Sequence, residues 1–134
     1  MPFLLPSARP FAVRGPAGLE KLMAKLLVTD DVVTVSMSAI EKAEALHGDV
    51  SVPRTSVVSA RVVPDGMDEV HGLRVPGTGL PGVIMVGTWR DRERVTFAVC
   101  HGRRPAVVLD LTGQRFDRIV VTVENPDEVV ASLP

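Results

Sequence analysis

VIMVGTWRDRERVTFAVCHGRRPAVVLDLTGQRFDRIVVTV, residues 83–123, is the stretch that decides the fold of this chain. Its apolar residues are mostly Val, Ile and Phe, which favour strands, and they form four short runs separated by turns with charged residues or glycine. Short connections usually join strands that are neighbours in a sheet. The segment therefore predicts a four-stranded antiparallel meander, with strands at 83–90, 94–101, 106–111 and 116–123.

The residues before this segment predict further strands. LLVTDDVVTVSM, residues 26–37, has the pattern of a β-hairpin whose turn lies at 29–31. Alternating Val residues predict a short strand that ends at Pro53 and another that ends at Pro64, because proline cannot donate a hydrogen bond to a strand ladder. Together with the meander, these strands predict a mainly β domain.

A capping box predicts a short helix between these strands. Ser38 and Glu41 have the required spacing, so we expect a helix over 39–47 that Gly48 ends in the left-handed conformation. Apolar residues at helical spacing are expected to face the core, and the charged residues to face solvent. The apolar stripe consists of Ile40, Ala43 and Leu46, and the charged face of Glu41, Lys42 and Glu44.

A second helix is predicted near the end of the sequence. Asn125 suits the N-cap position and Pro126 the first helical position, while Asp127 and Glu128 fall in the first turn, where the helix dipole favours negative charge. The apolar side of this helix consists of Val129, Val130 and Leu133.

The motifs V-P-x-[ST]-S-V, at 52–57, and P-G-T-G-L-P-G, at 76–82, carry a resemblance to a known group. With the stretches around them and HGRRPAVVLDLTGQRFDRIVVTVENPDEV, at 101–129, the chain resembles small bacterial proteins with a pleckstrin-homology-like (PH-like) domain, over residues 24–133. The resemblance implies an α+β, mainly β fold: a bent antiparallel sheet forming a PH-like barrel, with a short inserted helix and a C-terminal capping helix. PH-like folds mostly bind lipids, peptides or other domains, and the group has no established activity.

Length and composition fit one soluble domain. The chain has 134 residues, 46% of them hydrophobic, and a net charge of −1. We expect an extended or poorly ordered N-terminal arm over 1–23 and the PH-like domain over 24–134. The arm is expected to be a tail without a function; the alternative is that its apolar residues pack on the domain or on a partner. A single cysteine, Cys100, excludes an intramolecular disulfide and fits a reducing, cytoplasmic setting. No stretch approaches the ~20 apolar residues of a transmembrane helix, so no transmembrane segment is expected.

Three glycines have the spacing of a dinucleotide-binding turn. They are Gly77, Gly79 and Gly82, but the residues that follow predict a strand where that motif needs a helix. Pro81 also lacks the backbone N–H that would serve a phosphate. The glycines are therefore expected to permit a tight bend back into the sheet, with an anion-binding nest of N–H groups as the alternative.

Catalytic and metal-binding patterns are not recognised. Cys100 and His101 are adjacent on a predicted strand and point to opposite faces, so they are poorly placed to share a metal. Asp65, Asp68 and Glu69 are expected to solvate a loop rather than to transfer protons. The low net charge and the few aromatic residues argue against nucleic-acid binding. We predict a non-enzymatic protein without a cofactor or metal.

The long segment 64–82 is the predicted interaction site. Irregular segments longer than about 12–15 residues are uncommon and often functional, although a helical turn near 67–70 is expected to shorten this one. Its apolar residues are expected at the surface, which predicts a contact with a protein partner or packing over the barrel. The chain is thus predicted to be a binding or scaffolding module, and self-association through an exposed strand edge is possible. The predicted partner surface comprises Leu73, Arg74, Val75, Thr78, Leu80 and Trp89, with a core position as the alternative for Trp89.

Arginines in two turns give an alternative function. The turns at 90–94 and 113–115 are expected at the same end of the sheet, where their arginines would bind an anionic lipid or another anion. Neighbouring acids are expected to cancel part of this charge. The predicted anion-binding residues are Arg90, Arg92, Arg94 and Arg115, and the neighbouring acids include Asp91, Glu93 and Asp117.

Overall fold

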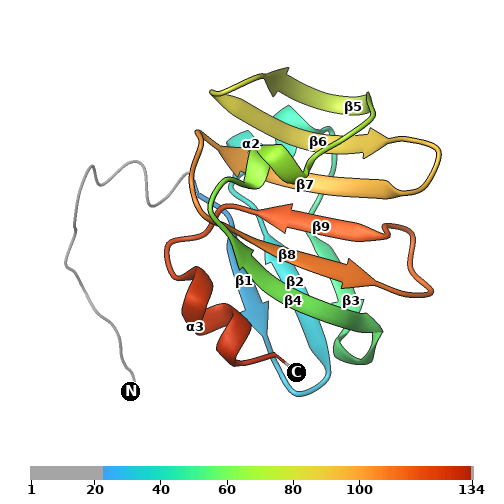
Figure 1. Ribbon diagram of the computed structural model, residues 1–134, viewed down its shortest axis with the longest axis vertical. Coiled ribbons are helices and arrows are strands. Elements are labelled where there is room, and N and C mark those ends of the chain that lie inside the picture. Colours follow the sequence, from blue (N-terminus) through green and yellow to red (C-terminus); the bar gives the residue numbers. More distant parts are fainter. Residues whose placement is uncertain (1–22, 134) are drawn as a thin grey trace.

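Two β-sheets lie one behind the other in the computed structural model, which describes residues 23–133 (Figure 1). The three-stranded sheet has the order β1-β2-β3, and the six-stranded sheet has the order β4-β8-β9-β7-β6-β5. Two α-helices and two 3₁₀ turns complete the described residues, so the fold is mainly β, as predicted. The elements are β1 (Lys25–Val28), β2 (Val32–Ser36), α2 (Ala39–Ala45), β3 (Val50–Pro53), η1 (Arg54–Ser56), β4 (Val57–Val63), η2 (Gly66–Glu69), β5 (Leu73–Leu80), β6 (Ile84–Arg90), β7 (Val95–His101), β8 (Ala106–Leu111), β9 (Arg118–Val121) and α3 (Pro126–Ala131).

The predicted meander is wrong at one position. β9 lies between β7 and β8, parallel to β7 and antiparallel to β8. The connection at 102–105 is short, but four extended residues reach about 13 Å, more than the ~10 Å needed to pass one strand. A short connection therefore does not force two strands to be neighbours. The antiparallel pairs β6–β7 and β8–β9 are as predicted.

The segment 64–82 is not a long loop. It contains η2, close to the predicted helical turn, and β5, which forms one edge of the six-stranded sheet (Figure 1). Its glycines explain how β5 pairs with β6: a Cβ on Gly77 would lie 2.5 Å from the carbonyl oxygen of Val86, and one on Gly87 would lie 2.6 Å from Gly77 Cα. The predicted tight bend into the sheet is confirmed at Gly82, which has a positive φ in the turn between β5 and β6. Gly77 and Gly79 lie inside β5 instead, and of these two only Gly77 has a positive φ.

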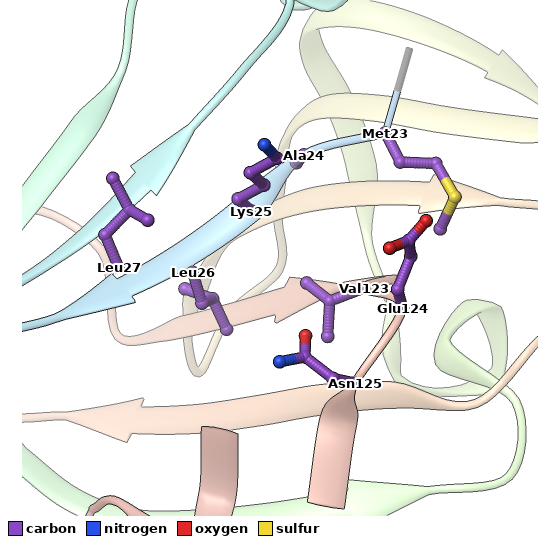
Figure 2. Close-up of a pocket in the computed structure, with 8 residues that line it drawn as sticks. All are labelled: Met23, Ala24, Lys25, Leu26, Leu27, Val123, Glu124 and Asn125. Carbon is purple, nitrogen blue, oxygen red and sulfur yellow. The ribbon is translucent and has the colours of Figure 1, made fainter. Parts of the chain in front are cut away.

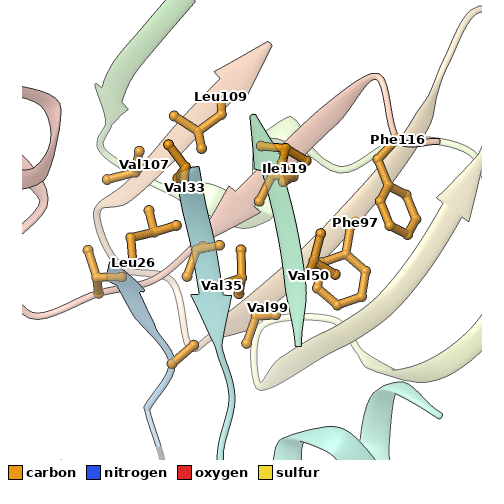
Figure 3. Close-up of a cluster of buried hydrophobic side chains, with 14 of the residues drawn as sticks. Leu26, Val33, Val35, Val50, Phe97, Val99, Val107, Leu109, Phe116 and Ile119 are labelled. Carbon is orange, nitrogen blue, oxygen red and sulfur yellow. The ribbon is translucent and has the colours of Figure 1, made fainter. Parts of the chain in front are cut away.

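The main core lies between the two sheets. Figure 3 shows Val33 and Val35 of the smaller sheet facing Val107, Leu109 and Ile119 of the larger one. Burial of these branched side chains on both inner faces holds the sheets together.

A second core covers the opposite face of the six-stranded sheet. Met67 of η2 and Val70 pack with Trp89 of β6 and Cys100 of β7. Trp89 is only 5% exposed, so it has the core position that the sequence left as the alternative. Cys100 is fully buried, and burial raises the pKa of its thiol to about 12. This cysteine is thus a core residue and not a reactive thiolate.

The helices begin where the sequence predicts. α2 follows Ser38, and α3 has Asn125 at its N-cap and Pro126 as its first residue. α3 packs against β4 and β8, but the two sheets are not closed, so the expected barrel is not confirmed. Neither described helix is long and apolar enough to span a membrane. The predicted arm, 1–23, lies outside the described residues except for Met23, which is buried.

Candidate functional site

The buried face of α2 carries an acidic residue, Glu41, one turn from the buried Ala45. Glu41 is 1% exposed, and its Oε1 accepts a hydrogen bond of 2.8 Å from the N–H of Ser38. The Ser38 hydroxyl oxygen accepts one of 3.1 Å from the N–H of Glu41, which completes the predicted capping box. The other carboxyl oxygen of Glu41 lies 2.7 Å from Nε2 of His101, at the end of β7. Glu41 therefore caps the helix and ties it to the sheet.

The prediction for the two faces of α2 is wrong. Ile40 is 55% exposed and Leu46 73% exposed, whereas Glu41, expected in solvent, is buried. His101 is the physical reason, since it offers a partner that lets a carboxyl group enter the interior. The N-terminal half of the helix is fixed by this contact, and its apolar stripe is left facing solvent.

The end of α2 is strained at an unexpected residue. Leu46, rather than Gly48, has the left-handed conformation, with a φ of 53°. This conformation costs a residue with a Cβ roughly 1–2 kcal/mol. A large apolar side chain that is both strained and 73% exposed adds little to folding. Such strain is typical of functional positions.

Leu46→Gly is expected to raise the free energy of unfolding by about 0.5–1 kcal/mol, because glycine removes the strain and loses only part of that gain as chain entropy. Urea denaturation would measure it. The control is Ala43→Gly, an exposed position inside the helix, which should lower stability by a similar amount. Equal destabilisation by both changes would show that the Leu46 side chain packs in the folded protein.

The apolar residues of β5 lie on the same side of the sheet as α2. Thr78 marks this side, since its hydroxyl donates a 2.9 Å hydrogen bond to the carbonyl oxygen of Glu44 in α2. The pairing register, with a bulge between Arg74 and Gly77, puts Leu73, Val75 and Leu80 on that side as well. Arg74 faces the other way: it donates to the carbonyl oxygen of Gly79, beside Trp89.

Exposed apolar side chains are concentrated around α2 and β5. Nine large apolar residues are exposed within 23–133, and six of them belong to the end and outer side of α2, to β5 and to the turn after it. We call this set the α2–β5 surface. It consists of Ile40, Leu46, Leu73, Val75, Leu80 and Val83, all between 55% and 80% exposed.

The predicted partner residues are thus divided. Leu73, Val75 and Leu80 are together on the α2–β5 surface, and Thr78 lies beneath it as a link to α2. Arg74 is on the opposite face and Trp89 is buried, so these two are not part of the surface. Ile40 and Leu46 were missed, although their exposure is the strongest sign that α2 belongs to the site.

The two arginine turns lie side by side, as predicted. The N–H of Asp117 donates to the carbonyl oxygen of Val95, and the N–H of Val95 donates to the Asp117 carboxylate, both at 2.8 Å. Within residues 23–133, Arg90, Arg92, Arg94 and Arg115 form no ion pair.

Acidic residues are nevertheless mixed with these arginines. Asp91 accepts hydrogen bonds from the N–H groups of Arg94 and Glu93, and these bonds lower the pKa of Asp91. Arg115 lies over the ring of Phe116, at 5.4 Å from its centre. The electrostatic potential around the two arginine turns therefore has contributions of both signs. Anion binding by these arginines stays a prediction.

The acids of segment 64–82 are engaged in ion pairs. Arg103 lies 2.6 Å from Asp65 and 3.1 Å from Asp68, and Glu69 lies 3.3 Å from Arg61. They hold η2 against the sheet instead of meeting in a cleft. No group of three potential metal ligands occurs among the residues that the structure describes.

A cleft of about 330 Å³ opens between β1 and the segment that joins β9 to α3 (Figure 2). Its wall includes Leu26 and Val123, with Lys25, Glu124 and Asn125 as the polar groups. These polar groups do not form a catalytic set, because no nucleophile or histidine accompanies them among the described residues that line the cleft. The cleft lacks the features of an active site, and the α2–β5 surface is the stronger candidate.

Comparison of the chain with protein-family models, with curated proteins and with solved structures finds no match.

Proposed function

We propose that the chain is a non-enzymatic, PH-like binding module that holds a protein partner on the α2–β5 surface. The observation that carries this proposal is that, of the nine large apolar residues exposed within 23–133, six belong to α2 and its end, to β5 and to the turn after β5, two elements that pack on each other. Single exposed apolar residues are normal, but a contiguous group of them is typical of an interaction site. The strain at Leu46 supports the same surface, since folding gains nothing from it.

Side-chain packing is the mode of binding that fits this surface. β5 is an edge strand, which in other proteins pairs with an added strand. However, Pro76 and the bulge beside it interrupt the middle of β5, and both features hinder edge-to-edge pairing. The partner is therefore expected to rest on the side chains of α2 and β5, rather than to extend the sheet.

The PH-like part of the proposal rests on the resemblance of three stretches of sequence and on two features of the fold. The strands form a mainly antiparallel β structure, and a helix follows the last strand and packs on β4 and β8. A module of this kind binds through its surface and needs no catalytic group.

Leu80→Asp is expected to reduce recovery of the partner at least tenfold, because a charge replaces a side chain that the partner buries. The measurement is quantitative affinity purification of the tagged chain from its host, comparing wild type and variant by mass spectrometry. Val58→Asp is the matched control, since Val58 is 67% exposed on β4, at the opposite edge of the sheet.

Circular dichroism and thermal unfolding should show that both variants remain folded, because both positions are exposed. Equal recovery of every partner by wild type and Leu80→Asp would contradict the proposal. A loss of folding in Leu80→Asp would also contradict it, since Leu80 would then be a core residue.

A further inference from the structure

We infer that the cleft between β1 and residues 123–125 is the docking site of a segment of this same chain, residues 9–14. The sequence of the segment is Arg-Pro-Phe-Ala-Val-Arg, and it lies outside the residues that the structure describes. The inference is independent of the α2–β5 surface and of the partner proposed for it.

The shape of the cleft suits an extended segment. Five consecutive residues, 23–27, line one side of it. Because successive side chains of a strand point to opposite faces, a cleft lined by consecutive residues runs along the edge of the strand. β1 is an edge strand of the three-stranded sheet, so its backbone groups on this side have no partner strand among residues 23–133. An extended segment can form hydrogen bonds with such an edge.

The apolar residues of the segment match the walls. Leu26 of β1 and Val123 lie on the two sides of the cleft (Figure 2). In an extended segment Phe11 and Val13 point to the same face, so both can enter between these walls. A volume of about 330 Å³ is at the small end of the range for binding pockets, which suits a few side chains rather than a folded partner.

The charges around the cleft favour a basic segment. Lys25 lines the cleft, and Nη1 of Arg104 lies 4.0 Å from Sδ of Met23 at its edge. Three exposed acids outnumber these two cations, and they form no ion pair within residues 23–133. The acids are Glu124 in the wall and Asp127 and Glu128 in the first turn of α3. Arg9 and Arg14, which flank the apolar pair, carry the complementary charge.

The connection to β1 allows the segment to return to the cleft. Residue 14 is nine positions before Met23, which itself lines the cleft, and nine extended residues reach about 30 Å. β1 has four residues and is only about 13 Å long. Residues 15–18, Gly-Pro-Ala-Gly, are typical of the tight turn that such a return needs. A tether this short gives an effective concentration of the order of 1 mM, so weak binding is enough to fill the cleft.

The experiment is hydrogen exchange of backbone amides, followed by NMR in the whole 134-residue chain. Phe11→Asp should release the segment, because it places a charge against apolar walls. The β1 amides that face the cleft should then exchange about tenfold faster or more, and the chemical shifts of residues 123–125 should change. Phe3→Asp is the matched control in the other apolar group before β1, which has no adjacent arginine, and it should leave these amides unchanged.

Two further measurements test the cleft itself. Glu124→Lys should release the segment as Phe11→Asp does, whereas Glu93→Lys, at an exposed acid in the turn 90–94, should not. The free hexapeptide of residues 9–14, at millimolar concentration, should restore the wild-type shifts in Phe11→Asp. It should leave the wild type unchanged, because the cleft of the wild type is already filled.

Three results would overturn the inference. They are equal exchange in wild type and Phe11→Asp, an equal response to Phe3→Asp, and equal binding of the hexapeptide by wild type and Phe11→Asp. Equal binding would show that the cleft takes such a peptide from elsewhere and not from its own chain. Circular dichroism will show whether the variants are folded, and Glu124→Lys keeps the test valid if Phe11→Asp is not.

Discussion

His101→Ala is expected to lower the free energy of unfolding by about 2–3 kcal/mol, the upper part of the usual cost of leaving a buried acceptor without its hydrogen-bond partner. Glu41 is 1% exposed, and His101 is the side chain that compensates its carboxyl group in the interior. Without the imidazole, Oε2 of Glu41 keeps no partner other than water that enters the gap. Urea denaturation at neutral pH measures the loss.

Glu41→Gln is the control that separates charge from packing. Glutamine is accepted in a capping box, so the bond to the N–H of Ser38 remains, and His101 is partly exposed and can be solvated. This variant should lose only about 1 kcal/mol, and adding it to His101→Ala should restore part of the stability. If His101→Ala costs no more than Glu41→Gln, the buried carboxyl group does not need its partner and the explanation of α2 is wrong.

Asp110→Asn is expected to lower the free energy of unfolding by about 2–3 kcal/mol at neutral pH. The Asp110 carboxylate accepts hydrogen bonds from Ser59 (2.9 Å), Arg61 (2.6 Å) and Arg118 (2.8 Å), on the face of the sheet that carries the second core. Arg118 is only 11% exposed, and its other acidic neighbour, Glu69, is 3.9 Å away. An amide at position 110 leaves this buried cation poorly compensated.

The pH dependence of this variant gives a second check. Burial raises the pKa of Asp110, but hydrogen bonds from Arg118, Arg61 and Ser59 outweigh burial and lower it from 3.8 to about 2. A depressed pKa stabilises the fold above the unfolded value and loses that effect as pH falls through the folded value, here between about pH 4 and pH 2. The shift corresponds to about 2 kcal/mol.

The stability difference between wild type and Asp110→Asn should therefore shrink by about 2 kcal/mol between pH 5 and pH 2. Other acids with lowered pKa values, such as Asp65 and Asp91, are present in both proteins and cancel in the difference. A difference that stays constant over this range would show that the three hydrogen bonds do not favour the ionised form.

Local signals in the sequence predicted local structure well. The capping box at Ser38 and Glu41, the hairpin near Asp30 and the start of α3 at Pro126 depend on residues within a few positions of one another. Local signals could not predict which face of α2 is buried. Its orientation depends on His101, which is 60 positions from Glu41, and an apolar count along the helix contains no information about that contact.

The sequence did not predict strand β5, for a related reason. Its two glycines and its proline are poor strand formers by propensity, and they suit a strand only because Gly77 meets Gly87 of β6 at close range. The exposed residues Leu73, Val75 and Leu80 could be predicted, since apolar residues among glycines and prolines are unusual. Ile40 and Leu46 could not be predicted, because their pattern is that of an ordinary core-facing stripe.

The position of β9 has a consequence for synthesis on the ribosome. Among the strands of the described residues β9 comes last in the sequence, yet it is one of the two central strands of the six-stranded sheet. Until residues 118–121 emerge, β7 and β8 each present an unpaired inner edge, and the nascent chain cannot close its sheet around them. Folding of the larger sheet must therefore wait for β9, the last of its six strands in the sequence, which makes folding slow and favours protection by chaperones until β9 has emerged.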